Sequence, residues 1–223
     1  MIVAFDIGKK NFAFTIIQID TSSLETISNI PSNTRYNTDK SGTPEFRAIL
    51  DKVFDCSQII LYRNIDLTEN CNSKKTLDPI SFLNMNRELN EYTDYWDKCS
   101  YFLIEQQMAF RGRCNIMALK LAQHCYSYFC NRYNRVNNII DYPAYYKTQI
   151  IGAAKSLVNT KPKRKKWAIA ESISILENRS ERCDTENTLL EFLNKRGGKK
   201  DDISDTYLMT LTFSYMKYLD KKY

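Results

Sequence analysis

Two short, wholly apolar segments of this chain each end in an acidic residue. Residues 2–5 (IVAF) are followed by Asp6, and residues 101–104 (YFLI) are followed by Glu105. A short continuous apolar run next to turn residues is typical of a strand that is buried on both faces of a sheet. A carboxylate at the end of such a strand projects from the rim of the sheet, where α/β folds locate their sites. The two runs therefore predict a layered α/β domain with an acidic site at one edge of its sheet.

The order of the other elements supports this fold class. Besides the two acid-terminated runs, the pattern predicts strands at 12–19, 24–30, 57–67 and 139–142. Helical spacing of apolar residues predicts helices at 45–56, 79–98, 111–132, 163–178, 188–195 and 201–218. Strands come first and then alternate with helices, which indicates a mixed sheet flanked by helices. We expect one domain over residues 1–223, with a possible insertion at about 31–79.

The last predicted helix supplies two further acids. Asp202 and Asp205 stand three residues apart in KKDDISDTYLMTL, so both lie on one helical face in the first turn. That face continues as Met209 and is predicted to point toward the sheet. Asp201 is predicted to be the helix N-cap, whose side chain accepts a backbone N–H. Each acid alone is more typical of a turn or a cap than of a site. Their joint pattern indicates a site.

The four acids Asp6, Glu105, Asp202 and Asp205 together predict a divalent-metal centre. Carboxylates buried side by side repel one another and lose hydration, which drives protonation unless a cation balances them. Ligands that are all carboxylate oxygens suit a hard cation such as Mg²⁺, with Mn²⁺ as a substitute. Two such ions per site are the arrangement that hydrolyses phosphodiesters by in-line displacement.

Basic residues indicate a polyanionic partner. The net charge is +6 and the sequence pI is about 8.8, which favours nucleic acid. A basic run at 161–166 opens a predicted helix, where cations oppose the helix dipole. We interpret it as a phosphate-binding patch, since counterion release is what such a cluster supplies; a localisation tract and a solvated helix start are the alternatives. The predicted DNA contacts are Arg111, Arg113, Lys163, Arg164 and Lys166.

Three segments carry a resemblance to a known family. IVAFDIGKKNFAF resembles the first motif of RuvC-like Holliday junction resolvases, FLIEQQMAFRGRCNIMALKL resembles the second, and GGKKDDISDTYLMTL resembles the last. The forms DIGKKN and IEQQ with a following FRGR look closest to the poxvirus resolvases, with mitochondrial fungal resolvases as cousins. The resemblance covers residues 1–30 and roughly 80–220, and it leaves 31–79 unmatched.

The resemblance implies an RNase H-like fold and metal-dependent cleavage of four-way DNA junctions by paired symmetric nicks. Residues 145–176 are similar to the lysine-bearing stretch of the family, which makes Lys147 and Lys165 the candidate catalytic lysines. A lysine near the phosphate would offset developing negative charge. Lys166, Lys199 and Lys200 are rivals. Symmetric nicking suits a C₂ homodimer, and we expect its interface on the helix at 113–132.

Other functions stay open at this point. An RNase H-superfamily nuclease acting on RNA–DNA hybrid or DNA ends would use the same acids, and a non-catalytic branched-DNA-binding protein could retain the fold. Sugar and acetate kinases also begin with a strand, Asp and Gly. They need glycine-rich phosphate loops, and this chain has six glycines and no such loop.

Cysteine usage and the chain start bear on location. The seven cysteines form no CxxC pair and there is one histidine, His124, so a structural zinc site is disfavoured. We expect free thiols in a reducing compartment. The first residues carry charges that a signal peptide would lack, and no apolar run reaches the roughly 18 residues of a membrane span. We expect a soluble intracellular protein without membrane partner or organic cofactor, in the host cytoplasm if the poxvirus resemblance holds.

Overall fold

Five strands form one mixed sheet in the computed structural model, which describes residues 1–73, 79–107, 115–134 and 138–223. The order across the sheet is β3-β2-β1-β4-β5. β1 is antiparallel to β2, and β2 to β3, whereas β1, β4 and β5 run parallel. The two acid-terminated strands are therefore central neighbours that end at the same edge. The strands are β1 (Ile2–Ile7), β2 (Phe12–Ile19), β3 (Ser57–Ile65), β4 (Tyr101–Glu105) and β5 (Ile139–Tyr142).

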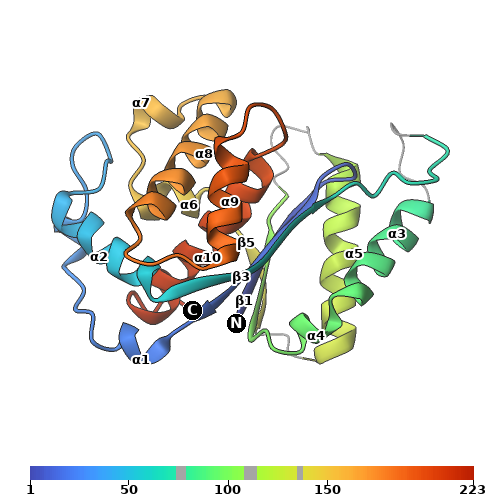
Figure 1. The fold of residues 1–223 in the computed structure, drawn as a ribbon, viewed down its shortest axis with the longest axis horizontal. Helices are drawn as coiled ribbons and strands as arrows, with labels where there is room; N and C mark the ends of the chain where they lie inside the picture. The colour runs from blue at the N-terminus through green and yellow to red at the C-terminus, as the bar shows by residue number, and fades with distance from the viewer. Residues whose placement is uncertain (74–78, 108–114, 135–137) are drawn as a thin grey trace.

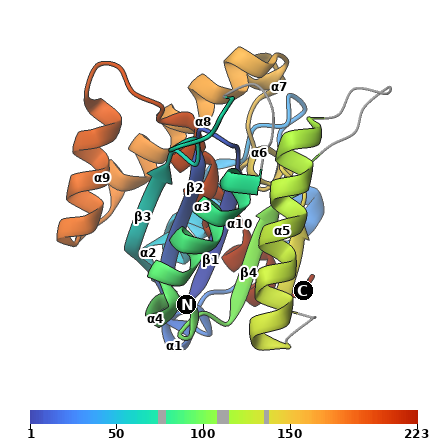
Figure 2. The ribbon, with the colours of Figure 1, turned by 90° about the vertical axis from the view of Figure 1, so that its right-hand side faces the viewer.

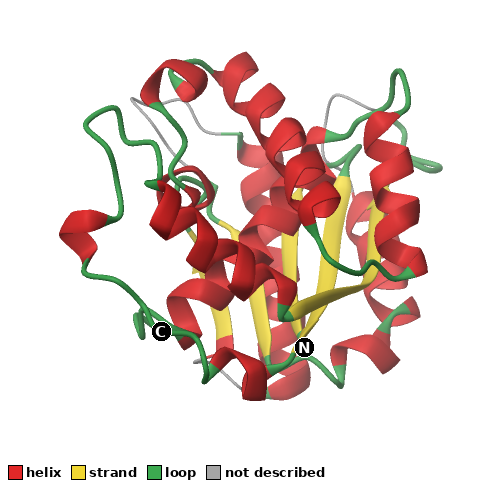
Figure 3. Ribbon diagram, turned by 60° about the vertical axis from the view of Figure 1, so that its left-hand side comes forward, coloured by secondary structure: helices red, strands yellow, loops and turns green. Residues whose placement is uncertain are grey.

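Helices cover both faces of the sheet (Figures 1 and 3). One face carries α2 (Pro44–Asp55), α6 (Tyr146–Ile151), α8 (Lys161–Asn178), α9 (Asp184–Asn194) and α10 (Asp201–Tyr218). The other face carries α3 (Pro79–Glu91), α4 (Thr93–Trp96) and α5 (Ile116–Tyr133), which stand in front of the sheet in Figure 2. Short helices at α1 (Thr21–Leu24), η1 (Ser32–Thr34) and α7 (Lys155–Val158) complete the described elements. Among these described helices, none is long and apolar enough to cross a membrane.

Alternation along the strands divides the core between these two layers. Ile2 and Ala4 of β1 pack in the cluster that contains α10, whereas Val3 and Phe5 pack in the cluster that contains α5. This follows from the period of two in a strand, which sends successive side chains to opposite faces. Asp6 shares the parity of Ile2 and Ala4, so its carboxylate belongs to the α10 side.

The last helix is the centre of its layer. Nearly every residue of α10 from Asp201 to Met216 is buried, because the sheet, α2, α6 and α8 surround it. Two hydroxyl pairs tie the helix to the sheet: Thr206 Oγ1 lies 2.8 Å from Thr15 Oγ1, and Thr212 Oγ1 lies 2.8 Å from the Tyr142 hydroxyl. Buried hydroxyls that satisfy one another fix the rotation of a helix that apolar packing alone would leave less determined.

The expected strand at 24–30 is wrong. Asp20 instead caps α1, since its carboxylate accepts the backbone N–H groups of Ser22 and Ser23, and β3 takes the third position in the sheet. The single helix expected at 79–98 is two helices, α3 and α4. The helices α6 and α7 were not predicted from the sequence.

The segment 31–43 is docked against the chain around α6. The Tyr36 hydroxyl donates to the Ile150 carbonyl at 3.1 Å, and Gly42 N–H donates to the Gly152 carbonyl at 3.1 Å. Gly152 has φ +79°, and a Cβ on it would lie 2.4 Å from the Gly42 nitrogen. Only glycine accommodates both conditions. Part of the unmatched stretch 31–79 therefore holds α6 in place, and another part forms α2 and β3; its status as an insertion stays a prediction.

Candidate active site

Asp6 and Glu105 occupy adjacent positions at the ends of two neighbouring strands. The parallel register pairs Phe5 with Ile104, so the next residues of both strands stand side by side. Leu103, two residues before Glu105, packs in the α10 cluster, and Glu105 therefore points to the same side as Asp6. The two carboxylates are close enough for a side-chain hydrogen bond between them. The strand ends thus bring two acids together beneath α10.

Asp205 of α10 and Lys147 of α6 complete this cluster. The Lys147 ammonium donates to Glu105 Oε1 at 3.1 Å and forms an ion pair with Asp205 Oδ1 at 2.9 Å. The side chains of Lys147, Glu105 and Asp205 are only 9%, 14% and 18% exposed. A cation on α6 therefore lies between two carboxylates that come from the sheet and from α10. We refer to Asp6, Glu105, Lys147 and Asp205 as the carboxylate cluster.

Burial and the crowding of negative charge raise the pKa values of Asp6 and Asp205. Burial raises the pKa of Asp6 well above its ordinary value, and the charges of Glu105 and Asp205 raise it further. Burial also raises the pKa of Asp205 to about 6, although Lys147 opposes the shift. For Lys147, burial lowers the pKa, but the carboxylates of Asp205 and Glu105 outweigh that effect and the net pKa is raised. The carboxylates of Asp205 and Glu105 thus keep the Lys147 ammonium charged despite its burial.

The head of α10 differs from the sequence prediction. Lys200 occupies the N-cap position and Asp201 begins the helix, so the prediction of Asp201 as N-cap is wrong. Its carboxylate instead forms an ion pair with Lys165 of α8, because α8 packs beside α10. This pairing outweighs burial and lowers the pKa of Asp201. Asp201 also acts on Asp205, whose pKa it raises, so it stands near the carboxylate cluster.

Asp202 has a different set of neighbours. It pairs with Lys199 at 3.5 Å. Burial raises the pKa of Asp202, the neighbouring Asp201 raises it further, and Lys199 lowers it. The structure therefore brings Asp6, Glu105 and Asp205 into one cluster with Lys147, and it places Asp201 and Asp202 together at the adjoining helix head.

The residues present fit a hard divalent cation. The donors of the three clustered acids are all carboxylate oxygens. As they stand, no group of three or more described His, Cys, Asp or Glu side chains could hold a metal ion. The Lys147 ammonium, between Glu105 and Asp205, supplies the positive charge that a metal ion would bring. The clustered carboxylates thus have the donor set that a hard cation prefers, and Lys147 balances their charge in this structure.

The predicted basic contacts fall into two groups. Lys163, Arg164 and Lys166 are exposed at the first turns of α8. Two of them reach back to the preceding turn, since Lys163 Nζ donates to the Ser156 carbonyl at 2.9 Å and Arg164 Nη1 to the Val158 carbonyl at 3.3 Å. Arg111 and Arg113 lie outside the described residues. The rival Lys200 donates to the Leu193 carbonyl at 2.9 Å.

Sequence reasoning missed two contributors to this region, α6 and Asp201. The signal for α6 was the short segment YKTQII between Pro143 and Gly152, the second of which caps the C-terminal end of the helix. The signal for Asp201 was its spacing of four from Asp205, which places both on one helical face as well as the spacing of three does.

No family model matches the chain, but comparison with known proteins finds sequence relatives and solved structures that are similar to it. "Uncharacterized protein 170L" of Invertebrate iridescent virus 6 is 27% identical over 244 aligned residues, which cover 99% of this chain and 91% of that protein. "Uncharacterized protein 97L" of Invertebrate iridescent virus 3 is 26% identical over 223 residues, covering 97% and 100%.

A solved structure matches the fold along almost the whole chain. The yeast mitochondrial Holliday junction resolvase Ydc2 superimposes with a TM-score of 0.54 at 14% sequence identity, and the match covers 99% of this chain and 83% of the resolvase chain. The expected fold class is confirmed: the chain has an α/β fold of the RNase H-like kind, a mixed five-stranded sheet flanked by helices.

Proposed function

We propose that this protein is a divalent-metal-dependent endonuclease that resolves four-way junctions and other branched DNA. The observation that carries the proposal is the carboxylate cluster, in which Asp6 and Glu105 from adjacent strands meet Asp205 from α10 around a buried ammonium. Support comes from the match of the fold to a Holliday junction resolvase and from the three resolvase-like motifs in the sequence. The two iridescent-virus relatives suit a role in resolving viral DNA, as in the poxvirus enzymes that the motifs resemble.

Each member of the site has a distinct role in this proposal. Asp6, Glu105 and Asp205 would hold Mg²⁺ or Mn²⁺, with Asp202 or Asp201 at the head of α10 as a further ligand. Bound divalent ions supply an activated water and stabilise the leaving oxygen of an in-line displacement. The chain itself positions the carboxylates, excludes bulk water through the buried surroundings of α10, and holds cationic side chains toward the phosphate.

Two lysines stand where a scissile phosphate would meet the site. Lys147 already contacts two cluster carboxylates, and it would turn to the phosphate once its partners bind metal. Lys165 pairs with Asp201 and is 39% exposed, so it can reach a ligand at the surface. We propose Lys147 as the catalytic lysine and Lys165 as a phosphate contact that also orients the helix head.

The exposed start of α8 is the proposed path of the DNA backbone. Lys163, Arg164 and Lys166 lie within two residues of Lys165, and their charges stand at a helix N-terminus where they gain nothing from the dipole. Replacing all three by glutamine should lower the slope of log affinity against log salt by about two to three, because each lost phosphate contact removes about 0.9 of slope. An unchanged slope would place the DNA elsewhere.

A homodimer remains part of the proposal. The interface is expected on the helix at 113–132, of which residues 113 and 114 lie outside the described residues. The described helix α5 begins at Ile116 and packs Leu121, Cys125 and Phe129 against the sheet. Its outward side carries Ile116, which is 62% exposed. That side, rather than the whole helix, is available to a second copy, and Ile116→Ser should weaken a dimer seen by analytical ultracentrifugation.

Cleavage of matched substrates tests the function directly. Purified protein with Mg²⁺ should nick a synthetic four-way junction and leave linear duplex and RNA–DNA hybrid of the same sequence largely intact. Asp6→Asn should abolish cleavage and keep junction binding, because it removes a metal ligand and no DNA contact. Asp94→Asn, the same change at an exposed position of α4, should cleave normally. Preferential cleavage of the hybrid, or cleavage by Asp6→Asn, would contradict the proposal.

A further inference from the structure

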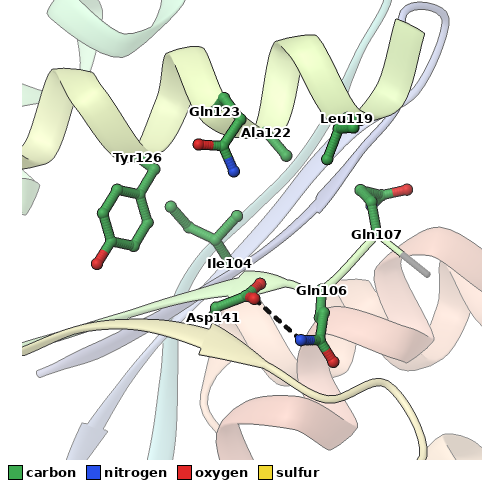
Figure 4. Close-up of a pocket in the computed structure, with 8 residues that line it drawn as sticks. All are labelled: Ile104, Gln106, Gln107, Leu119, Ala122, Gln123, Tyr126 and Asp141. Carbon is green, nitrogen blue, oxygen red and sulfur yellow. Dashed lines mark hydrogen bonds between the residues drawn. The ribbon is translucent and has the colours of Figure 1, made fainter. Parts of the chain in front are cut away.

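A pocket of about 540 Å³ lies at the carboxyl ends of β4 and β5, on the face of the sheet that carries α5 (Figure 4). Its apolar lining consists of Ile104 from β4, Leu119 and Ala122 from α5, and the ring of Tyr126. The volume lies within the about 300–1,000 Å³ that small-molecule sites usually occupy. None of the residues named for the metal centre lines this pocket, although it shares their end of the sheet.

The position of the pocket relates it to the carboxylate cluster. Ile104 and Glu105 are consecutive in β4, so one faces the pocket and the other faces α10. Asp141, which lines the pocket, is the register partner of Ile104 in β5. The pocket and the cluster therefore lie on the two sides of the same rim. A single strand that crosses this rim with a phosphate at the cluster can place a neighbouring nucleotide at the pocket.

The polar lining fits a base better than a phosphate. The pocket has no lysine or arginine among the described residues that line it, and it contains the carboxylate of Asp141, which repels phosphate. Three amide side chains accompany this acid: Gln106, Gln107 and Gln123. Amides and a carboxylate beside an apolar floor are the groups that read the hydrogen-bonding edge of a nucleobase.

The pocket is organised for a ligand that donates hydrogen bonds. Gln106 Nε2 donates to Asp141 Oδ2 at 3.0 Å (Figure 4), which fixes the carboxylate at the mouth of the pocket. The second Asp141 oxygen then remains as an acceptor for a ligand. Gln123 projects from α5 on the opposite side, with its amide directed toward Ile104, and offers one donor and one acceptor group. A ligand between them meets a carboxylate on one side and an amide on the other.

We propose that this pocket binds one unpaired nucleobase that carries an exocyclic amino group, taken from the DNA strand held at the carboxylate cluster. The proposal rests on the proposed nuclease function and gives it a base preference. The base lies on Ile104 and Ala122 beside the Tyr126 ring, its amino group donates to Asp141, and the Gln123 amide pairs with the adjacent ring atom. Cytosine, adenine and guanine have this amino group. Thymine presents a carbonyl oxygen instead, which would face the carboxylate.

Binding to a junction series tests the preference. The parent is the cleavage-deficient Asp6→Asn protein, and the probes are fluorescein-labelled four-way junctions identical except for one unpaired nucleotide beside the branch point, varied among the four bases. Anisotropy should show thymine at that position binding about tenfold more weakly than the best amino-bearing base, the discrimination typical of one good base contact. Asp141→Asn should reduce that ratio to about twofold or reverse it, because its amide N–H can donate to the thymine carbonyl.

Two further variants test whether the base preference comes from contacts in the pocket. Gln123→Leu changes an exposed helical position to a good helix former, and it should weaken binding of the preferred base while leaving thymine affinity unchanged. Asp94→Asn removes the same charge at α4, at the opposite end of β4, and should keep the tenfold ratio. Circular dichroism melts of each variant check that it is folded.

The outcomes distinguish failure of the pocket proposal from failure of the proposed nuclease function. Junction binding with equal affinity for the four bases, or an unchanged ratio in Asp141→Asn, overturns the pocket proposal alone. Loss of a dimer in Gln123→Leu and Asp141→Asn with an unchanged base ratio also overturns it and makes this face a contact between copies. A parent protein that binds linear duplex as tightly as every junction overturns the proposed function and the pocket proposal together.

Discussion

Replacing Lys147 by methionine should destabilise the metal-free protein. The substitution keeps an unbranched side chain as far as the Cε position but removes an ammonium that stands 2.9 Å from Asp205 and 3.1 Å from Glu105 in nearly buried surroundings. Breaking a buried ion pair costs about 3–5 kcal/mol. We expect the lower end, about 3 kcal/mol, because Asp205 can take up a proton near neutral pH once its cation is gone.

The corresponding assay compares thermal melts of wild type and Lys147→Met in two conditions. One buffer contains EDTA, and the other is calcium-free and contains Mg²⁺ or Mn²⁺. For a domain of this size each 1 kcal/mol shifts Tm by about 2–4 °C, so the metal-free Lys147→Met protein should melt about 6–12 °C below wild type. Divalent metal should raise the Tm of Lys147→Met back toward that of wild type, because the ion binds the same carboxylates and no ammonium competes for them. Calorimetric titration should show Mn²⁺ binding about tenfold tighter in the variant if about 1.4 kcal/mol of competition is relieved.

A matched control separates this effect from a general loss of charge. Lys120→Met replaces an exposed lysine of α5 and should change neither the metal-free Tm nor the Mn²⁺ affinity. The reasoning is refuted if Lys147→Met melts with wild type in EDTA, or if metal raises the Tm of both proteins by the same amount.

The other predictions concern the head of α10, the docking of segment 31–43 against the chain around α6, and the buried ion pair between Arg179 and Glu186. Asp201→Asn and Asp202→Asn, compared by Mn²⁺ calorimetry, should differ at least fivefold in affinity, and the weaker binder identifies the helix-head ligand; wild-type affinity in both variants would exclude both residues as ligands. Gly152→Ala places a Cβ 2.4 Å from the Gly42 nitrogen, and it should lower kcat for junction cleavage more than it raises KM. An unchanged kcat would show that the docked segment 31–43 does not position α6. Arg179→Met leaves Glu186 without its partner at 2.7 Å and should cost about 3–5 kcal/mol in urea unfolding; a loss below about 1 kcal/mol would contradict this structural role.

Much of the fold follows from local patterns in the chain. The runs at 2–5 and 101–104 are buried central strands because they are apolar on both faces, and they remain so in the structure. The helix at 201–218 was predicted with its observed bounds. It follows two glycines with positive φ, and glycine is the residue that ends one helix and admits the turn into the next.

The failures arise where tertiary contacts decide the local structure. The residues at 24–30 include the apolar Leu24, Ile27 and Ile30. The sheet position that they would fill is taken by β3, which pairs along the whole of β2. The short helix α6 has too few residues to show a period of its own. It is held by the docked segment 31–43, a contact between distant parts of the chain that periodicity cannot reveal.

The candidate site divides in the same way. Asp6 and Glu105 were predictable because the strand that carries each acid is unmistakable and a parallel pair brings both ends to one edge. Which of Asp201 and Asp202 faces the carboxylate cluster depends on the rotation of α10 about its axis. That rotation is fixed by the buried hydroxyl pairs between the helix and the sheet. The resemblance pointed to Lys147 and Lys165, but only the packing of α6 and α8 distinguishes a buried lysine among carboxylates from a half-exposed one.

The most direct test of the central claim is the anomalous scattering of a crystal soaked in Mn²⁺. We predict anomalous peaks that contact the carboxylates of Asp6 and Asp205, with the Lys147 ammonium moved away from its present partners. Peaks only at exposed acids, with Lys147 still bridging Glu105 and Asp205 at millimolar Mn²⁺, would contradict the assignment of this cluster as a metal centre.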